Sequence, residues 1–555
     1  MNKKVCSFPI LFALLALLIG TCAVVFPASA QAAPTSTGSI TVSGTVASRY
    51  DAYQIFSANV VDGDSDAKIA TDLAWASGAA RDAALPVLHS AGMPNSQATA
   101  QEAAEWLNTD SHLTSALSAQ LARSLQSSGA KSVALNAGTA AELSCGYWLI
   151  VAKDDAIAQG EAGTAPIMAL VGGSAVTVKP KAATPKVSKH VLEDSTAAWQ
   201  KAADATVADD LYWRLSATVP AGLTAYDTYT VQFVDTMGAG LDPSKVAASV
   251  RVYAAAGTDG GFDAVPAGRD GRAGTEPAKG WTDITAQCAT KVAADGTFTV
   301  RTGDLIAALG GTDAFAAGAR VAAVYNAPLN SACNHGIAKG NPNEVYLRYP
   351  RSPLADQSGD AGFTRTPSDD ACAYTWDLAL TKRGSDGDKP LAGAVLSIAD
   401  DRGRTLATDG TWDAEGKATV TTGEDGRVSV SGVDSGKLQV RELKAPKGYT
   451  AFEGTRCVTV KAEGLDVDQV AAAKPKLTIT AESPLRADSA DGSTGSLEAS
   501  LINTPTGTPP SITTGGFMPS TGDMAMYAAA AAAVAGAALI VVALLVKRGG
   551  GSHKE

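Results

Sequence analysis

A lysine, a glutamate and an asparagine each end an apolar row in the C-terminal part of this 555-residue chain. Side chains alternate across a β-strand, so residues two apart share a face. The rows are Trp376, Leu378, Leu380 and Lys382; Leu438, Val440 and Glu442; and Leu497, Ala499, Leu501 and Asn503. An isolated buried charge costs several kcal/mol, so we expect these three polar groups to meet one another inside a core.

These three residue types permit a reaction when they are buried together. Burial lowers the pKa of a lysine, which gives a neutral amine, and raises the pKa of a glutamate, which gives an acid that polarises the asparagine carbonyl. Attack of the Lys382 amine on the Asn503 amide carbon then expels ammonia and leaves a new amide. From alternation alone, a non-covalent Lys–Glu pair with Asn503 as a hydrogen-bonding neighbour is the alternative.

Two earlier segments show the same arrangement of a polar residue on an apolar face. Val187, Lys189 and Val191 share one face, and Val231, Phe233 and Asp235 share another. The sequence therefore predicts a second buried lysine and a second buried acid.

Strands must position these residues. After Pro185 the chain alternates as strands do, is interrupted by Gly, Pro and Asp turns, and shows no long helical period up to about Thr504. We expect a mainly β protein with tandem immunoglobulin-like β-sandwich domains at residues 182–370 and 371–504. Residues 31–181 predict a mixed α+β domain.

Within this N-terminal domain, helical spacing and a buried strand are the main signals. A helix is predicted by Leu113, Leu117, Leu121 and Leu125, after an N-cap at Asp110. A buried strand is predicted at residues 146–151, beside Cys145, which is interpreted as a core thiol.

Composition excludes several classes of function. The net charge is -11 and the basic residues are scattered, so no nucleic-acid partner is expected. No hydrolase, zinc-protease or Walker motif is present, so we expect neither an enzyme with turnover nor a cofactor or metal site.

The cysteines are too few for a disulfide scaffold and form no C-x-x-C pair. Cys6 and Cys22 lie in the predicted leader, and the pairing of the others stays open, with Cys288–Cys333 and Cys372–Cys457 as possible bridges. The remaining cysteines are Cys145, Cys288, Cys333, Cys372 and Cys457.

Both ends carry targeting signals. Residues 1–30 read as a secretory signal peptide that is cleaved after Ala30. Residues 505–517 read as an extended wall-crossing linker, and the apolar residues 524–546, followed by Lys547 and Arg548, read as a membrane segment with a basic tail. A simple membrane tether is the alternative, but it leaves unexplained the pentapeptide that stands just before this segment.

That pentapeptide, Met518-Pro519-Ser520-Thr521-Gly522, resembles the LPxTG-like sorting signal of sortase substrates, with Met in place of the usual Leu. The resemblance implies that a transpeptidase cysteine attacks the carbonyl of Thr521, releases Gly522 onward, and transfers the threonyl group to an amine. It also implies a secreted protein that is anchored to the cell wall.

The C-terminal domain resembles the Cna-B or SpaA-like domains of Gram-positive pilins. Lys382 lies in TKRGSDGDKPLAGAVLSI and Glu442 lies in LQVRELKAPKGY. The resemblance implies an isopeptide bond between Lys382 and Asn503 and a catalytic role for Glu442, the acid of the family's E-box.

The middle domain resembles the fimbrial isopeptide-forming D2 domain in PKVSKHV and FVDTMGAGL. The family's closing strand ends with an asparagine, whereas GNPNEVYLRYPRSP places Arg351 there. We therefore expect no isopeptide bond in this domain and a buried ion pair between Arg351 and Asp235. Asn341 and Asn343 remain as alternatives to Arg351 if the register differs.

Lys181, in Val176-Thr177-Val178-Lys179-Pro180-Lys181, is similar to the acceptor lysine of the pilin motif. The combined resemblance implies the major shaft subunit of a covalently polymerised surface pilus that supports adhesion. Its expected partners are a class C-type pilin sortase, a housekeeping sortase, identical subunits joined head to tail, minor pilins, peptidoglycan and a host ligand. A monomeric wall-anchored adhesin or a minor pilin, which does not need Lys181, is the alternative.

Overall fold

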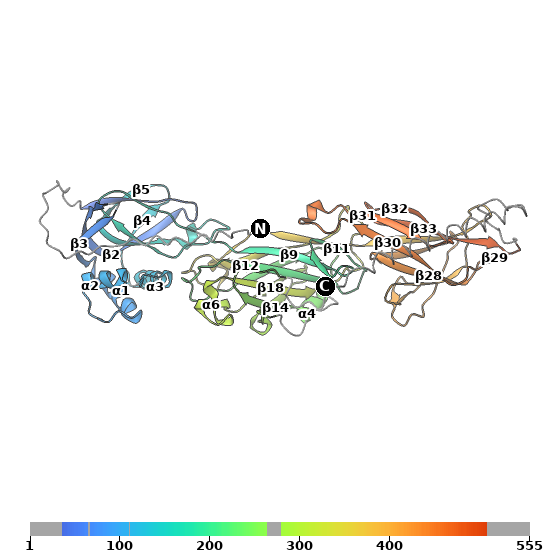
Figure 1. The fold of residues 1–555 in the computed structure, drawn as a ribbon, viewed down its shortest axis with the longest axis horizontal. Helices are drawn as coiled ribbons and strands as arrows, with labels where there is room; N and C mark the ends of the chain where they lie inside the picture. The colour runs from blue at the N-terminus through green and yellow to red at the C-terminus, as the bar shows by residue number, and fades with distance from the viewer. Residues whose placement is uncertain (1–35, 65–66, 110, 182, 263–278, 508–555) are drawn as a thin grey trace, which may run out of the picture.

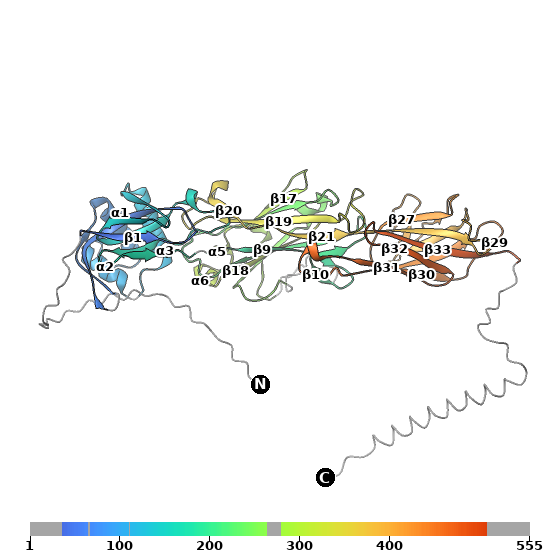
Figure 2. The same cartoon turned by 90° about the horizontal axis from the view of Figure 1, so that it is seen from above.

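Three β-rich units follow one another along the long axis of the molecule (Figures 1 and 2). The computed structural model describes residues 36–64, 67–109, 111–181, 183–262 and 279–507. We call the units N-terminal (residues 37–178), middle (186–374) and C-terminal (376–505). The expectation of a mainly β protein with tandem sandwich domains is confirmed.

The N-terminal unit combines two sheets with three helices. The first sheet contains β1 (Thr37–Val42), β5 (Ala140–Ser144) and β8 (Val176–Val178). The second contains β2 (Arg49–Asp62), β3 (Lys68–Trp75), β4 (Ser132–Asn136), β6 (Gly146–Ala152) and β7 (Ile167–Val171). The helices are α1 (Gly78–Ser90), α2 (Ala100–Asn108) and α3 (Ser115–Ser127), and they cover one side of this unit (Figure 1).

Helix α3 begins later than its spacing predicted. The Oγ1 of Thr114 accepts a hydrogen bond from the backbone N–H of Leu117 at 3.1 Å, so Thr114 is the N-cap of this helix. Asp110, the predicted N-cap, lies outside the described residues. Leu113 therefore precedes the helix and is 38% exposed, whereas the other three predicted leucines are buried. Strand β6 and the buried Cys145 lie where the sequence predicted them.

The middle unit has two sheets around one core. One sheet contains β9 (Lys186–Glu193), β10 (Ala198–Gln200), β12 (Tyr212–Val219), β14 (Arg251–Ala256), β15 (Thr282–Asp283) and β18 (Ala319–Asn326). The other contains β11 (Ala202–Asp204), β13 (Gln232–Met237), β16 (Ala289–Val292), β17 (Thr297–Arg301), β19 (Asn341–Pro350), β20 (Phe363–Arg365) and β21 (Asp369–Tyr374). Short helices lie at α4 (Val246–Ser249), α5 (Leu305–Ala308) and α6 (Thr312–Ala316). Because β21 pairs with β19, the unit extends past the boundary expected at residue 370.

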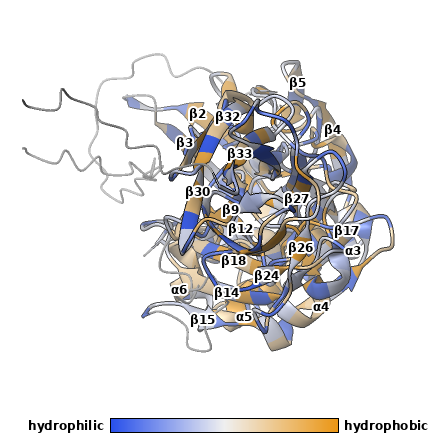
Figure 3. Cartoon of the chain, turned by 90° about the vertical axis from the view of Figure 1, so that its right-hand side faces the viewer, coloured by the Kyte–Doolittle hydropathy of each residue, from blue (hydrophilic) through white to orange (hydrophobic). Residues whose placement is uncertain are grey.

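The C-terminal unit is also a two-sheet structure. One sheet contains β22 (Trp376–Gly384), β27 (Arg427–Val433), β29 (Tyr449–Thr450), β32 (Leu485–Asp491) and β33 (Ser496–Pro505). The other contains β23 (Val395–Ala399), β24 (Thr405–Leu406), β25 (Trp412–Asp413), β26 (Val420–Thr421), β28 (Gly436–Lys444), β30 (Thr455–Glu463) and β31 (Lys476–Ala481). Viewed along the rod, the strands carry both hydrophobic and hydrophilic residues, as expected when one face of each sheet is buried (Figure 3).

The first and last strands of the C-terminal unit lie side by side. Strands β22 and β33 pair in parallel, with Lys382 opposite Leu501 and Gly384 opposite Asn503. Any covalent link between these two strands would tie the start of the unit to its end.

Within the described ranges no disulfide is formed, so neither Cys288–Cys333 nor Cys372–Cys457, the bridges considered from the sequence, is present. The predicted signal peptide, wall linker, sorting signal and membrane segment lie in residues 1–35 and 508–555, outside the described residues. In the part of the chain that the structure describes, no helix is long and apolar enough to cross a membrane.

Candidate isopeptide sites

The structure brings Lys382, Glu442 and Asn503 together in the core of the C-terminal unit. Lys382 is fully buried, Asn503 is 2% exposed and Glu442 is 6% exposed. The lysine and the asparagine come from the paired strands β22 and β33, whereas the glutamate comes from β28 of the other sheet. The acid therefore reaches the lysine and the asparagine from across the sandwich.

Hydrogen bonds fix the geometry of this C-terminal site. The Nδ2 of Asn503 donates to both carboxylate oxygens of Glu442, at 2.9 and 3.0 Å. The Nζ of Lys382 lies 3.5 Å from Oε1 of Glu442 and donates to the backbone carbonyl of Leu501 at 3.3 Å. The backbone N–H of Phe452 donates to Glu442 at 3.0 Å. Glu442 thus contacts both groups that the reaction requires.

Burial prepares the lysine for nucleophilic attack. Desolvation lowers the pKa of Lys382 to about 8, although the carboxylate of Glu442 opposes this shift. A larger share of the amine is therefore neutral near physiological pH than in an exposed lysine. Within the described residues, Oδ1 of Asn503 has no hydrogen-bond partner, so this oxygen can still accept a hydrogen bond from an acid.

A second buried lysine–acid pair lies in the middle unit. Lys189 on β9 forms an ion pair with Asp235 on β13, and both side chains are fully buried. The hydroxyl of Tyr325, on β18, accepts a hydrogen bond from Lys189 at 2.9 Å and donates to Asp235 at 3.0 Å. The predicted pairing of a lysine with an acid in this unit is therefore present in the structure.

The third member of this middle site is Asn343 and not Arg351. Asn343 is fully buried on β19, and its Nδ2 donates to the hydroxyl of Tyr325 at 2.9 Å. Arg351 follows the end of β19 and donates instead to the carbonyls of Asp154 and Phe363, each at 3.2 Å. The predicted ion pair between Arg351 and Asp235 is wrong, because the inward row of β19 ends before residue 351.

The pKa of the lysine in the middle site is shifted in the same direction as that of Lys382. Burial lowers the pKa of Lys189 to about 8, against the opposing effect of Asp235. Burial also raises the pKa of Asp235, with Lys189 opposing that shift. The Oδ1 atoms of Asp235 and Asn343 are without hydrogen-bond partners among the described residues. An amine of lowered pKa, an acid of raised pKa and an asparagine therefore meet in one core.

Alternation along β19 contained the signal for Asn343. Its inward row is Asn343, Val345, Leu347 and Tyr349, and each of these residues is buried. The same reasoning that found Asn503 at the end of an apolar row therefore applies here. The resemblance to the D2 domain pointed instead to Arg351 in the run after Tyr349. The register expected from that resemblance was therefore several residues too late. Tyr325 carries no comparable signal, because a tyrosine in a buried strand is ordinary.

Lys181 lies in the connection between the first two units. It is exposed and follows β8, which ends at Val178, while β9 begins at Lys186. A cavity of about 320 Å³ lies beside it and is lined by Lys179 and Lys181 together with residues of both units. The lining includes Ser115, Ala165, Ile167, Leu223, Tyr226 and Pro353. In the described part of the chain, no cluster of ligating side chains could hold a metal ion.

Part of the C-terminal unit is similar to a known family. Residues 377–474 match the family model described as the SpaA prealbumin-like fold domain. The trypsin-resistant surface T6 protein of Streptococcus pyogenes serotype M6 is 30% identical over 143 residues, which is 24% of this chain and 24% of that protein. The chain thus matches about a quarter of the length of this relative.

Solved structures of pilins are similar over more of the chain. The T6 backbone pilin of serotype M6 Streptococcus pyogenes is 17% identical, with 86% of this chain and 100% of that chain covered and a TM-score of 0.46. The major pilin SpaD of Corynebacterium diphtheriae is 14% identical, with 84% and 98% covered and a TM-score of 0.41. Residues 377–474 are thus similar to the SpaA prealbumin-like fold domain, and part of the chain is similar to the T6 surface protein.

Proposed function

We propose that this protein is the shaft subunit of a covalently polymerised pilus whose C-terminal and middle units each carry an intramolecular isopeptide bond. The observation that carries the proposal is the burial of Lys382 and Asn503, each in contact with the buried Glu442. Burying a lysine and an acid in a small core costs free energy. A covalent crosslink between the first and last strands would offset this cost.

The reaction in the C-terminal unit balances without a co-reactant. The lone pair of neutral Lys382 Nζ attacks Cγ of Asn503, and a new N–C bond forms. The C–Nδ2 bond breaks, and the amide nitrogen leaves as ammonia after it receives a proton. Glu442 contacts both nitrogens and is positioned to carry this proton from the amine to the leaving group.

The middle unit supports the same reaction between Lys189 and Asn343. Asp235 takes the place of Glu442, and the Tyr325 hydroxyl connects all three groups. This proposal replaces our expectation that Arg351 precludes a bond in this unit. The protein is not proposed to turn over a substrate, because each bond forms once within its own chain.

Polymerisation would use the exposed Lys181 as the acceptor amine. A pilin-class sortase would join Thr521 of one subunit to Lys181 of the next, and a housekeeping sortase would join the last subunit to peptidoglycan. The described chain ends just after β33 of the C-terminal unit, whereas Lys181 lies between β8 and β9, which belong to the other two units. The cavity beside Lys181 offers room for the uncharged, proline-containing segment that precedes Thr521 in a second copy.

A denaturing immunoblot of wall extracts from the native host tests the polymer. Wild type should give a ladder of high-mass species, and Lys181→Ala should abolish it because the acceptor amine is absent. Lys186→Ala, an exposed lysine at the start of β9, is the matched control and should keep the ladder. One wall-linked species in wild type and both variants would instead indicate a monomeric adhesin or a minor pilin.

A further inference from the structure

The cavity beside Lys181 lies between the N-terminal and middle units. It has a volume of about 320 Å³, and both units and the connection between them form its walls. The lining residues that the argument uses are Gly163, Ile167, Lys179, Lys181, Leu223, Tyr226 and Pro353. Lys181 is thus an exposed lysine that lines a hollow built by two units.

Direct contacts between the two units fix the walls of this cavity. The backbone N–H of Gly163 donates to the carbonyl of Arg351 at 2.7 Å, and a guanidinium N–H of Arg123 donates to the carbonyl of Pro353 at 2.9 Å. The other terminal nitrogen of Arg123 forms an ion pair with Asp227 at 2.7 Å. The walls are therefore held in place before any partner arrives.

The lining of this cavity combines apolar side chains with two lysines. Ile167, Leu223 and Tyr226 contribute large apolar surfaces. Among the described residues that line the cavity, Lys179 and Lys181 are charged and none carries a carboxyl group. An occupant with no charge and with one large apolar side chain suits these walls.

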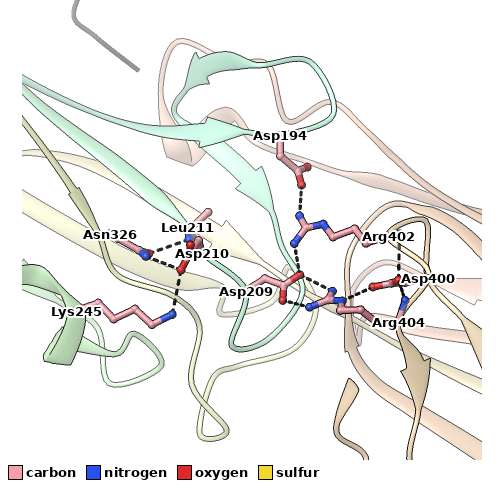
Figure 4. Close-up of polar contacts among 9 residues, drawn as sticks. All are labelled: Asp194, Asp209, Asp210, Leu211, Lys245, Asn326, Asp400, Arg402 and Arg404. Carbon is pink, nitrogen blue, oxygen red and sulfur yellow. Dashed lines mark hydrogen bonds and ion pairs between the residues drawn. The ribbon is translucent and has the colours of Figure 1, made fainter. Parts of the chain in front are cut away.

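The cavity at the other junction, between the middle and C-terminal units, has a charged lining. It has a volume of about 540 Å³ and is lined by several carboxyl groups and by Arg402. Arg402 and Arg404 of the C-terminal unit both bind Asp209 of the middle unit, as Figure 4 shows. Arg402 also reaches Asp194 at 3.2 Å. An uncharged segment that entered there would desolvate charged groups without pairing them, so the cavity beside Lys181 suits such a segment better.

The sequence that follows the described chain is uncharged. Residues 508–522 contain no charged side chain, and their large apolar residues are Ile512, Phe517 and Met518. Met518 belongs to the predicted sorting signal. Ile512 stands nine residues before Thr521, whereas Phe517 stands four residues before it and can lie at most about 14 Å away. Outside the sorting signal, Phe517 is therefore the large apolar residue nearest to Thr521 in the sequence.

We propose that this cavity receives Phe517 of a second copy, which makes Phe517 a positioning residue for the joining of Thr521 to Lys181. The inference rests on the proposed polymerisation and names the contact that would guide it. The described chain ends at residue 507, and the 14 residues from there to Thr521 span at most about 50 Å. The C-terminal unit of the second copy can therefore stand clear of Lys181 while its tail reaches the cavity.

Phe517 takes no part in the bond that forms. The acyl group of Thr521 arrives as a thioester of the sortase cysteine, and the neutral amine of Lys181 attacks its carbonyl carbon. The N–C bond forms, the C–S bond breaks, and the amine proton passes to the departing sulfur. Phe517 acts before this step, because its burial in the cavity holds Thr521 beside Lys181.

Binding of a synthetic peptide of residues 511–521 tests the contact without any sortase. The partner is the purified chain from residue 31 to residue 521, with Phe517→Ala so that its own tail cannot compete. The labelled peptide should bind and gain fluorescence anisotropy, and the same peptide with Phe517→Ala should bind at least about tenfold more weakly. Equal binding of the two peptides, or no binding of either, would overturn the proposal.

Matched variants of the cavity locate the binding site. Ala221→Trp adds a large side chain at an exposed position of the cavity wall and should weaken peptide binding at least about tenfold. Ala293→Trp, at an exposed position of the same unit outside the cavity, should bind the peptide as well as the parent chain does. Undiminished binding to Ala221→Trp would place the peptide elsewhere and overturn the proposal.

The ladder in wall extracts of the native host tests the role in assembly. Phe517→Ala should lose at least about tenfold of the high-mass species and keep the single wall-linked species, because the sorting signal is intact. Phe517→Leu should restore most of the ladder, since leucine also fills an apolar space, and Ile512→Ala should behave as wild type.

The contrary outcomes separate this contact from the polymer itself. A full ladder in Phe517→Ala would overturn the contact and leave the polymer standing. Loss of the wall-linked species together with the ladder would assign Phe517 to recognition by sortase and would also overturn the contact. A wild type without a ladder would overturn both the contact and the proposed polymerisation.

Discussion

The two buried lysine sites differ in how the acid reaches the asparagine. In the C-terminal unit, Glu442 hydrogen-bonds directly to Asn503. In the middle unit, the hydroxyl of Tyr325 stands between Asp235 and Asn343 and bonds to both. Aspartate is one methylene shorter than glutamate, and the tyrosine hydroxyl spans the remaining distance. Both sites therefore hold a buried lysine and a buried asparagine, and the proton path of the proposed reaction would differ between them.

The strand arrangement of the two sites also differs. Lys382 and Asn503 stand on paired strands of one sheet, with the acid on the other. Asp235 and Asn343 stand on the paired strands β13 and β19, with the lysine on the other sheet. A bond in the C-terminal unit would therefore tie two strands of one sheet, and a bond in the middle unit would tie the two sheets.

The largest effect is expected for loss of the C-terminal bond. In Glu442→Gln the proton carrier is absent, so Lys382 and Asn503 should remain unlinked. A crosslink that closes a loop of about 100 residues stabilises by about 4–5 kcal/mol if the disulfide entropy model applies. Denaturant unfolding of the C-terminal unit should show a loss of about this size. Glu424→Gln, an exposed control, should not, and equal stability of the two variants would contradict the site.

A smaller and selective effect is expected for Tyr325→Phe. The change removes the hydroxyl that connects Lys189, Asp235 and Asn343, so bond formation in the middle unit should slow by about tenfold, equivalent to one buried hydrogen bond of about 1.4 kcal/mol. A time course of intact mass after refolding measures this rate. The C-terminal bond should form at its normal rate, and slowing of both bonds would show that the two sites are not independent.

The pH dependence of bond formation should be similar in the two sites. Each lysine has a pKa of about 8, and only the neutral amine attacks. The rate should therefore rise about tenfold per pH unit below this value and level off above it. The loss of ammonia during refolding across a pH series measures the rate. A rate that falls over the same range would contradict attack by the amine.

The smallest effect is expected at Arg351. Arg351→Asn removes two hydrogen bonds to carbonyl groups and should cost about 1 kcal/mol of stability. It should release no additional ammonia, because residue 351 does not face Asp235. Intact mass and thermal unfolding measure the two outcomes. An additional loss of ammonia in this variant would restore Arg351 to the site and displace Asn343.

Alternation along strands predicted much of this structure. Lys382, Glu442, Asn503, Lys189 and Asp235 all face inward as expected, because a period of two fixes which side chains point into a sandwich. Asn343 was missed because a family register was given more weight than the chain's own inward row. Tyr325 and the acids of the junction were beyond prediction, since their contacts depend on how separate sheets and units pack.

The intact mass of the mature chain tests the central claim most directly. The account predicts that wild type is lighter than its sequence by two molecules of ammonia, that Lys382→Ala and Lys189→Ala each retain the loss of one, and that the double variant loses none. Fragmentation should locate the links at Lys382–Asn503 and Lys189–Asn343. A wild-type mass equal to that of the sequence would contradict both bonds.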